Sequence, residues 1–268
     1  MTFAVPGSNA PSCSLSLCAL AFGAGIYRTG KSYLLNQLMG KSNAFTVGPT
    51  VKACTKGIWL WGRAMELDGS DTHVLFLDTE GLGSTVRSET YDTRIFALAL
   101  LLSSYFIYNS FGTIDGAAVA KLSLVVNLTK HIHVRAQAAG SRGGGEDSGT
   151  EFSHFFPSFL WVVRDFGVKL EKEGRKISAR EYLEDALRPE EGLTEAIESK
   201  NAVRMLLRNF FPERDCITMV RPVSDEKALA ALATIPNESL RPEFRAQIEA
   251  MRKRLIPACG PRRSMARP

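Results

Sequence analysis

The stretch from Gly25 to Ser32 (GIYRTGKS) constrains the fold more than any other part of the chain. It fits the pattern G-x-x-x-x-G-K followed by Ser or Thr, in which glycines let backbone N–H groups converge on phosphate oxygens. An apolar run, Leu15–Phe22, precedes it, and a helix-like segment begins at Tyr33. The positive end of that helix would face the same phosphates. We therefore predict a phosphate-binding loop, with Lys31 near the β and γ phosphates and Ser32 as a ligand of Mg²⁺.

Two later segments support the same interpretation. In His73–Gly81 (HVLFLDTEG) four apolar residues lead into Asp78, which is typical of a buried parallel strand that delivers a carboxylate to the ligand-binding edge of the sheet. We predict that Asp78 contributes to a Mg²⁺ site and that the Gly81 backbone approaches a γ-phosphate. Thr55 stands just before a strand-like segment, where nucleotide switches place a second Mg²⁺ hydroxyl. The alternative for Thr55 is a β-branched residue that simply opens a strand.

Strand-like and helix-like segments alternate along the chain, which predicts an α/β fold of the P-loop NTPase class with a mostly parallel central sheet and helices on both faces. We expect further strands at Tyr105–Tyr108, Phe159–Phe166 and Cys216–Val220, and a polar loop at Gly83–Thr93. Expected helices are Ile95–Leu102, Ile114–Ile132, Ala196–Phe211, Asp225–Leu232, Pro242–Leu255 and one that ends at Leu187 after the capping box Ser178–Glu181. We predict one domain over residues 15–256, with a disordered segment at 1–14 and a disordered basic tail at 257–268.

The composition excludes several classes of protein. The 268 residues are 45% hydrophobic and 23% charged, with a net charge of +5, as in an ordinary globular protein. Five cysteines without a C-x-x-C pair argue against a disulfide framework or zinc site and favour a reducing compartment, so we predict a cytoplasmic protein without a secretory signal. The uncharged run Ile95–Gly112 contains polar residues, which favours a buried helix and strand over a membrane span. The basic tail is compatible with peripheral contact to anionic lipid; no nucleic-acid partner is predicted.

The base that such a site would bind is harder to predict. The N/T-K-x-D motif that reads guanine in small GTPases is absent, because its nearest candidate, Thr129–Ile132 (TKHI), lacks the aspartate. Arg164–Asp165 at a strand end is a substitute, since one carboxylate can accept hydrogen bonds from both N1–H and the amino group of guanine. Adenine would leave that carboxylate unpaired. From these two residues alone a structural ion pair remains the alternative, and ATP remains the alternative nucleotide.

Six segments together resemble the GTPase domain of guanylate-binding proteins, in the dynamin superfamily, and are most similar to its plant and protist members. They are GIYRTGKSY (25–33), CTKGIWLW (54–61), DTEGLG (78–83), IFALALLLSSYFIYNSFG (95–112), WVVRDF (161–166) and RPV (221–223). The resemblance covers about residues 15–256 in order.

The resemblance implies roles for individual residues. Arg28 matches an internal arginine finger that acts on the phosphates once two GTPase domains pair, Asp165 matches the guanine-reading aspartate, and Arg221 lies in the segment that caps guanine. The implied nucleotide-binding residues are Gly25, Arg28, Thr29, Gly30, Lys31, Ser32, Tyr33, Gly81, Arg164, Asp165 and Arg221. The implied catalytic residues are Arg28, Lys31, Thr55 and Glu80, and the implied Mg²⁺ ligands are Ser32, Thr55 and Asp78.

The resemblance implies hydrolysis of GTP to GDP with Mg²⁺, in a homodimer that forms through the GTPase domain. Two departures leave an alternative open, a nucleotide-gated assembly module with little hydrolysis. Ala53 stands where animal relatives carry a serine that helps to place the attacking water, and the helical region that follows the domain in the family is absent from this sequence. A truncated gene product is therefore one interpretation. The membrane-fusing atlastin branch would need transmembrane hairpins, which we do not find.

Overall fold

The computed structural model describes residues 18–25, 29–48, 55–66, 73–82, 89–122, 156–192 and 194–258. Several predictions lie outside these residues: the finger residue Arg28, Ala53, the disordered segment 1–14, most of the tail 257–268, the loop at 83–88 and the second half of the helix expected at Ile114–Ile132. The described part of the chain contains no helix that is long and apolar enough to cross a lipid bilayer.

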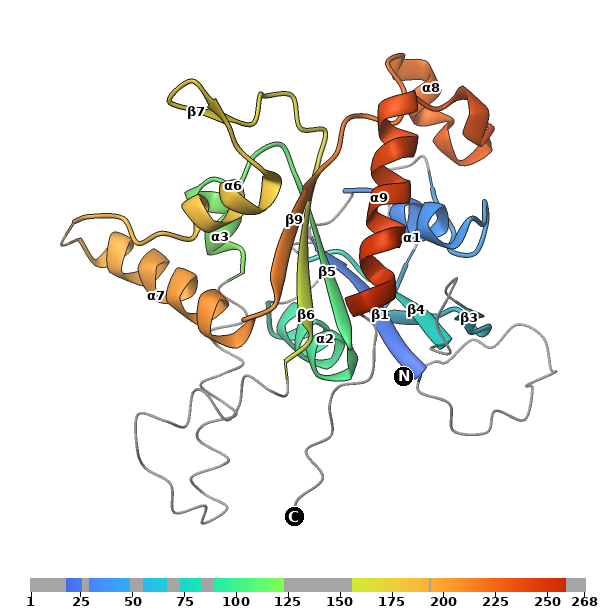
Figure 1. The fold of residues 1–268 in the computed structure, drawn as a ribbon. Coiled ribbons are helices and arrows are strands. Elements are labelled where there is room, and N and C mark those ends of the chain that lie inside the picture. The colour runs from blue at the N-terminus through green and yellow to red at the C-terminus, as the bar shows by residue number, and fades with distance from the viewer. Residues whose placement is uncertain are drawn as a thin grey trace, which may run out of the picture.

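The predicted α/β class is confirmed. A seven-stranded sheet has the order β2-β4-β1-β5-β6-β9, with β3 also paired to β4 (Figure 1). Its strands are β1 (Cys18–Gly25), β2 (Ile58–Leu60), β3 (Met65–Glu66), β4 (His73–Thr79), β5 (Tyr105–Phe111), β6 (Ser158–Arg164) and β9 (Arg214–Thr218). The neighbours β4, β1, β5, β6 and β9 are parallel, whereas β2 and β3 run antiparallel to β4. The sheet is therefore mostly parallel, and the carboxyl ends of its central strands meet at one edge.

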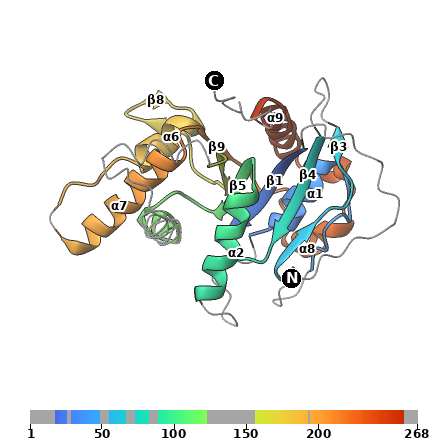
Figure 2. The same cartoon turned by 90° about the horizontal axis from the view of Figure 1, so that it is seen from below.

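Helices cover both faces of this sheet. They are α1 (Lys31–Met39), α2 (Glu89–Leu102), α3 (Gly116–Ala120), α6 (Ala179–Ala186), α7 (Glu195–Phe210), α8 (Glu226–Ala230) and α9 (Pro242–Ala258), with two 3₁₀ turns, η1 (Leu232–Thr234) and η2 (Asn237–Ser239). Residues of α2, α3, α6 and α7 pack in one hydrophobic cluster, and residues of α1 and α9 pack in the other. Figure 2 shows α2, α6 and α7 away from α1 and α9, with the strands between them.

Alternate residues of the buried strands pack in the two hydrophobic clusters, one on each face of the sheet. In β6, Phe159, Trp161 and Val163 join the first cluster, whereas Leu160 and Val162 join the second. This alternation follows from the period-two geometry of a strand. Because both faces are covered, the central strands are apolar almost throughout. The sheet is thus held rigidly between two cores, and the loops at its carboxyl edge are positioned by it.

Several predicted boundaries were wrong by a few residues. The first strand begins at Cys18 and continues to Gly25, because its glycine-rich end still pairs with β5. Helix α2 begins at Glu89, inside the segment expected to be a polar loop, since Asp92 is buried and Tyr91 donates to Glu80. The last strand begins at Arg214 and ends at Thr218, where its pairing with β6 ends.

One small element had no counterpart in the prediction. Strands β7 (Glu171–Lys172) and β8 (Arg175–Lys176) form a hairpin whose turn holds Glu173 and Gly174 at φ 52° and 76°. Its strands carry only charged, exposed side chains, so the sequence has no apolar alternation that would reveal it. The predicted capping box is confirmed at the start of α6, where the Ser178 and Glu181 side chains each bond the other's backbone N–H.

Candidate functional site

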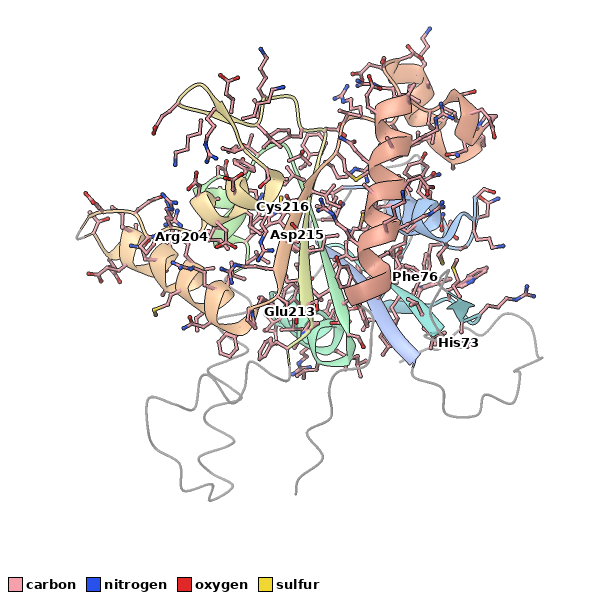
Figure 3. All side chains as sticks on the ribbon, viewed as in Figure 1. His73, Phe76, Arg204, Glu213, Asp215 and Cys216 are labelled. Carbon is pink, nitrogen blue, oxygen red and sulfur yellow. The ribbon has the colours of Figure 1, made fainter. Side chains whose placement is uncertain are left out.

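A cavity of about 750 Å³ opens where the loops follow β1, β4 and β6, the edge at which α/β sheets bind ligands. Its lining is Thr29, Gly30, Lys31, Ser32, Tyr33, Thr46, Val47, Gly48, Thr55, Thr79, Gly81, Phe111, Arg164, Asp165, Pro222, Glu226 and the run Leu229–Thr234. His73 and Glu213 lie by contrast at the amino ends of β4 and β9, at the opposite end of the sheet from α8 (Figure 3).

The phosphate loop is built on the two glycines that the motif requires. Gly25 has φ +140°, and a Cβ there would lie 2.1 Å from the backbone oxygen of Asn109 in β5. Gly30 has φ +78° and precedes the first turn of α1 as its N-cap, without a side-chain hydrogen bond. The first N–H groups of α1 therefore receive no side-chain cap, and the positive end of the helix dipole faces the cavity.

Lys31 lies in the first turn of α1 and lines the cavity, although the residue is only 7% exposed. Burial of an ammonium group is costly in the absence of compensating charge. The buried Asp78 carboxylate supplies part of that compensation, because the charge of Lys31 acts on Asp78. A phosphate group in the cavity would supply more.

Ser32, Thr55 and Asp78, which the sequence places in three separate segments, come together. Ser32 Oγ and Thr55 Oγ1 each donate to Asp78 Oδ2 at 2.7 Å, and the two hydroxyl oxygens lie 3.4 Å apart. Asp78 is 0% exposed, and its other oxygen, Oδ1, has no hydrogen-bond partner among the described residues. Two hydroxyls and a carboxylate are hard oxygen ligands of the kind that Mg²⁺ prefers.

The protonation of Asp78 bears on the fit of a cation. Burial raises the pKa of Asp78, and the hydrogen bond from Ser32, the charge of Lys31 and the hydrogen bond from Thr55 oppose that rise only in part. A bound cation would favour the carboxylate form and satisfy the buried Oδ1. The residues present therefore fit a magnesium ion.

The strand end Arg164–Asp165 also lines the cavity. Asp165 adopts φ 54°, an unusual conformation for a residue with a side chain. Its Oδ2 accepts from Arg221 Nε at 2.8 Å, and Arg221 also bonds Glu226 at 3.0 Å. The ion pair of Asp165 is thus with Arg221 and not with its neighbour Arg164. Both oxygens of a carboxylate have two lone pairs, so this pair leaves acceptor capacity for a base.

Arg164 faces the phosphate loop instead of solvent. It is 4% exposed, its Nη1 donates to the Gly30 carbonyl at 3.4 Å, and its guanidinium lies 5.6 Å from the centre of the Phe244 ring. Burial lowers the pKa of Arg164. Tyr33 stacks on the same Phe244 ring, with 6.3 Å between centroids, and burial raises its pKa to about 12. Arg164 and Tyr33 therefore join the hydrophobic cluster under α9 to the wall of the cavity.

Comparison with known proteins gives the family. The family model for the N-terminal domain of guanylate-binding proteins matches residues 14–260. Guanylate-binding protein 1 of Chlorocebus aethiops is 44% identical over 226 residues, which cover 84% of this chain and 37% of that protein. The chain belongs to the guanylate-binding protein family. Guanylate-binding protein 7 of Homo sapiens is also 44% identical over 226 residues, 84% of this chain and 35% of that protein.

The chain spans about a third of the length of the curated guanylate-binding proteins that it matches. Among solved structures, Toc33 from Arabidopsis thaliana in complex with Mg²⁺ and GMPPNP aligns with a TM-score of 0.43 and 12% identity, covering 90% of this chain and 84% of that chain. At that TM-score the alignment adds nothing to the topology described above. The predicted family resemblance is confirmed, whereas the expected similarity to plant and protist members stays a prediction.

Most residues that this resemblance assigned to the site converge on the cavity. Thr29, Gly30, Lys31, Ser32, Tyr33, Thr55, Gly81, Arg164 and Asp165 line it. Gly25 and Asp78 lie behind the lining, where they shape the loop and hold the two hydroxyls. Arg221 is not among the lining residues but reaches the site through Asp165. The roles themselves stay predictions.

Glu80 occupies a place that the guanylate-binding protein motif did not suggest. Its Oε2 accepts from the Gly57 N–H at 3.1 Å and from the Tyr91 hydroxyl at 3.2 Å, and its own N–H donates to the Gly57 carbonyl at 2.8 Å. Glu80 is buried and is not among the lining residues. In this conformation its side chain joins the segment after Thr55 to the segment after Asp78 and to α2.

Sequence reasoning missed several residues of the site, and two examples show why. The run Leu229–Ala233 from α8 to η1 supplies an apolar wall, but its sequence, LAALA, resembles any helical segment. Asn109, at the carboxyl end of β5, bonds the phosphate loop. A polar residue that ends a buried strand is the same signal that identified Asp78, so this one could have been found.

Proposed function

We propose that the chain binds GTP with Mg²⁺ in this cavity and hydrolyses it to GDP. The observation that carries the proposal is that one cavity is lined both by residues suited to phosphate and Mg²⁺, which we call its phosphate end, and by a carboxylate suited to a base, which we call its base end. Lys31, Ser32 and Thr55 line the first, and Asp165 lines the second. Membership of the guanylate-binding protein family supports the choice of guanine and of a hydrolase.

Each residue at the phosphate end has a physical part in the proposed reaction. The Lys31 ammonium and the N–H groups at the start of α1 would bind phosphate oxygens and stabilise the charge that develops on them. Ser32 and Thr55 would give their hydroxyl oxygens to Mg²⁺, and Asp78, whose Oδ2 accepts from both hydroxyls, would orient them and contribute its free Oδ1 to the same ion. The ion, when bound, neutralises charge on the β and γ phosphates.

At the base end, Asp165 would select guanine. Its carboxylate can accept from N1–H and from the amino group, which adenine cannot offer together. Arg221 holds one carboxylate oxygen at 2.8 Å and thereby fixes the orientation of the group. The apolar run Leu229–Ala233 would cover the purine.

We further propose that turnover depends on dimerisation, with Arg28 acting as a finger on the phosphates once two GTPase domains pair. Arg28 lies within the phosphate-loop motif, and a guanidinium there can neutralise transition-state charge. We expect GTP turnover per molecule to rise with protein concentration. We expect Arg28→Ala to lower turnover by roughly 10³-fold, the lower range for arginine fingers. Phosphate release measured across a dilution series tests both.

The matched control is Arg175→Ala, which removes an exposed arginine from the β7–β8 hairpin. It should leave turnover unchanged. Turnover per molecule that stays constant on dilution would contradict activation by pairing. An Arg28→Ala variant with the turnover of the parent chain would show that Arg28 is not a finger. Neither of these two results would contradict the proposal that the chain binds GTP.

One observation favours a second candidate function, a nucleotide-gated assembly module with little hydrolysis. The Glu80 carboxylate is engaged by Gly57 and Tyr91 and does not line the cavity. In this conformation it does not orient an attacking water. Product analysis after prolonged incubation with GTP distinguishes the two functions, because only the hydrolase accumulates GDP.

A further inference from the structure

Asn109 links the strand β5 to both ends of the phosphate loop. Its amide Nδ2 donates to the backbone oxygen and to the side-chain Oγ1 of Thr29, both at 2.8 Å. Its backbone oxygen lies so close to Gly25 that a Cβ there would be 2.1 Å away. Asn109 is 1% exposed. One residue, 80 positions away in the sequence from Thr29, thus contacts the first and the fifth positions of the motif.

The hydrogen-bonding capacity of the Asn109 side-chain amide decides whether it bonds the phosphate loop or the nucleotide. The Thr29 carbonyl can only accept, so it must face the NH₂ group of Asn109 and not its oxygen. The remaining Oδ1 is buried and has no hydrogen-bond partner among the described residues. Phosphate oxygens are acceptors as well, so Oδ1 gains nothing from contact with a polyphosphate. The side chain therefore acts on the loop and not on the ligand.

We propose that Asn109 is a positioning residue that holds the phosphate loop in the conformation that binds nucleotide. The inference rests on the proposed function, because it concerns the same site. A glycine-rich loop that is free to move must be ordered when the nucleotide binds, and that cost lowers affinity. A loop that two hydrogen bonds already hold on a rigid central strand loses less conformational freedom when the nucleotide binds. The benefit should be largest for ligands that place more phosphates against the loop.

The test compares Asn109→Asp and Asn109→Ala with Ser110→Ala. The aspartate is the same size as asparagine, but as a carboxylate it cannot donate to Thr29. Ser110 is the next residue in β5, is equally buried, and its Oγ accepts from Trp161 Nε1 at 2.8 Å. Its loss also breaks one buried hydrogen bond, but one that does not reach the loop. Ser110→Ala therefore reports the effect of a structural defect in the same strand.

Affinities for GMP, GDP and GTP, and the thermal midpoint, are measured for all variants with Mg²⁺. We expect both Asn109 variants to lose roughly tenfold or more in GDP and GTP affinity, as two hydrogen bonds are lost. The loss for GMP should be smaller. All three variants should lower the thermal midpoint, because each loses buried hydrogen bonding. In Ser110→Ala, however, the ratio of GMP to GDP affinity should stay as in the parent chain.

Two outcomes would overturn the inference. One is an Asn109→Asp variant that folds and keeps the parent ratio of GMP to GDP affinity. The other is a Ser110→Ala variant whose ratio changes as much as that of the Asn109 variants. If Asn109→Ala does not fold, Asn109→Asp carries the comparison by itself. A parent chain that binds none of the three nucleotides would instead contradict the proposed function, which separates the two failures.

Discussion

Lys31→Met should weaken GTP binding by roughly a hundredfold or more while the chain stays folded. Methionine keeps an apolar stem of similar length but removes the ammonium group. A charge-assisted hydrogen bond is worth about 1.5–3 kcal/mol, and a lysine between two phosphates makes more than one. Each 1.4 kcal/mol is a factor of about ten in affinity. Because Lys31 is 7% exposed, solvent does not screen its charge as it would at the surface. Isothermal titration with GTP and Mg²⁺ measures the effect.

Lys41→Met is the matched control at the other end of the same helix. Lys41 is exposed and follows Gly40, the C-cap of α1. The change in net charge is the same, but the charge lies away from the positive end of the helix. Its GTP affinity should equal that of the parent chain. Equal losses in the two variants would mean that general electrostatics, and not a phosphate contact of Lys31, governs binding.

Asp165→Asn should change the base preference of the site. The amide presents a donor where the carboxylate presented an acceptor. The variant should therefore donate to the C2 oxygen of xanthine and lose the hydrogen bond from the amino group of guanine. Sites that hydrogen-bond a substrate group discriminate strongly against analogues without it. We expect the ratio of GTP to xanthosine triphosphate affinity to fall on the order of a hundredfold or more. Competition titration with the two nucleotides measures the ratio directly.

Asp225→Asn provides the control for this experiment. Asp225 accepts from the Ala228 N–H as the N-cap of α8, and asparagine caps helices equally well. The variant removes one carboxylate near the site without touching its lining, so the base preference should stay unchanged. If Asp165→Asn also keeps the preference of the parent chain, Asp165 does not read the base and its ion pair with Arg221 is purely structural.

The residues that the motifs singled out lie close together because most of them follow the ends of buried strands, although their roles stay predictions. An apolar run that ends in Asp78 has few structures open to it other than a parallel strand with its carboxylate at the edge. Ser32, Thr55 and Asp78 were assigned to one magnesium site from three separate segments, and the structure brings their oxygens within hydrogen-bonding distance. The central sheet and the two helical layers followed from the same alternation.

Tertiary contacts account for what the sequence could not predict. Helix α2 starts six residues before the expected Ile95, because Tyr91 and Asp92 are held by the folded protein and not by local propensity. Glu80 was assigned from its motif, yet its carboxylate is bound by Gly57 and Tyr91. The ion pair of Asp165 with Arg221 spans 56 positions and leaves no pattern in a single sequence.

The central claim is that one cavity binds a guanine nucleotide together with Mg²⁺. Parallel isothermal titrations of the chain with GTP and with ATP, each with Mg²⁺ and with EDTA, test it most directly. The account predicts that GTP binds in the presence of Mg²⁺, that EDTA weakens its binding, and that ATP binds far more weakly under both conditions. Equal affinity for ATP and GTP, or GTP binding that is indifferent to Mg²⁺, would contradict it.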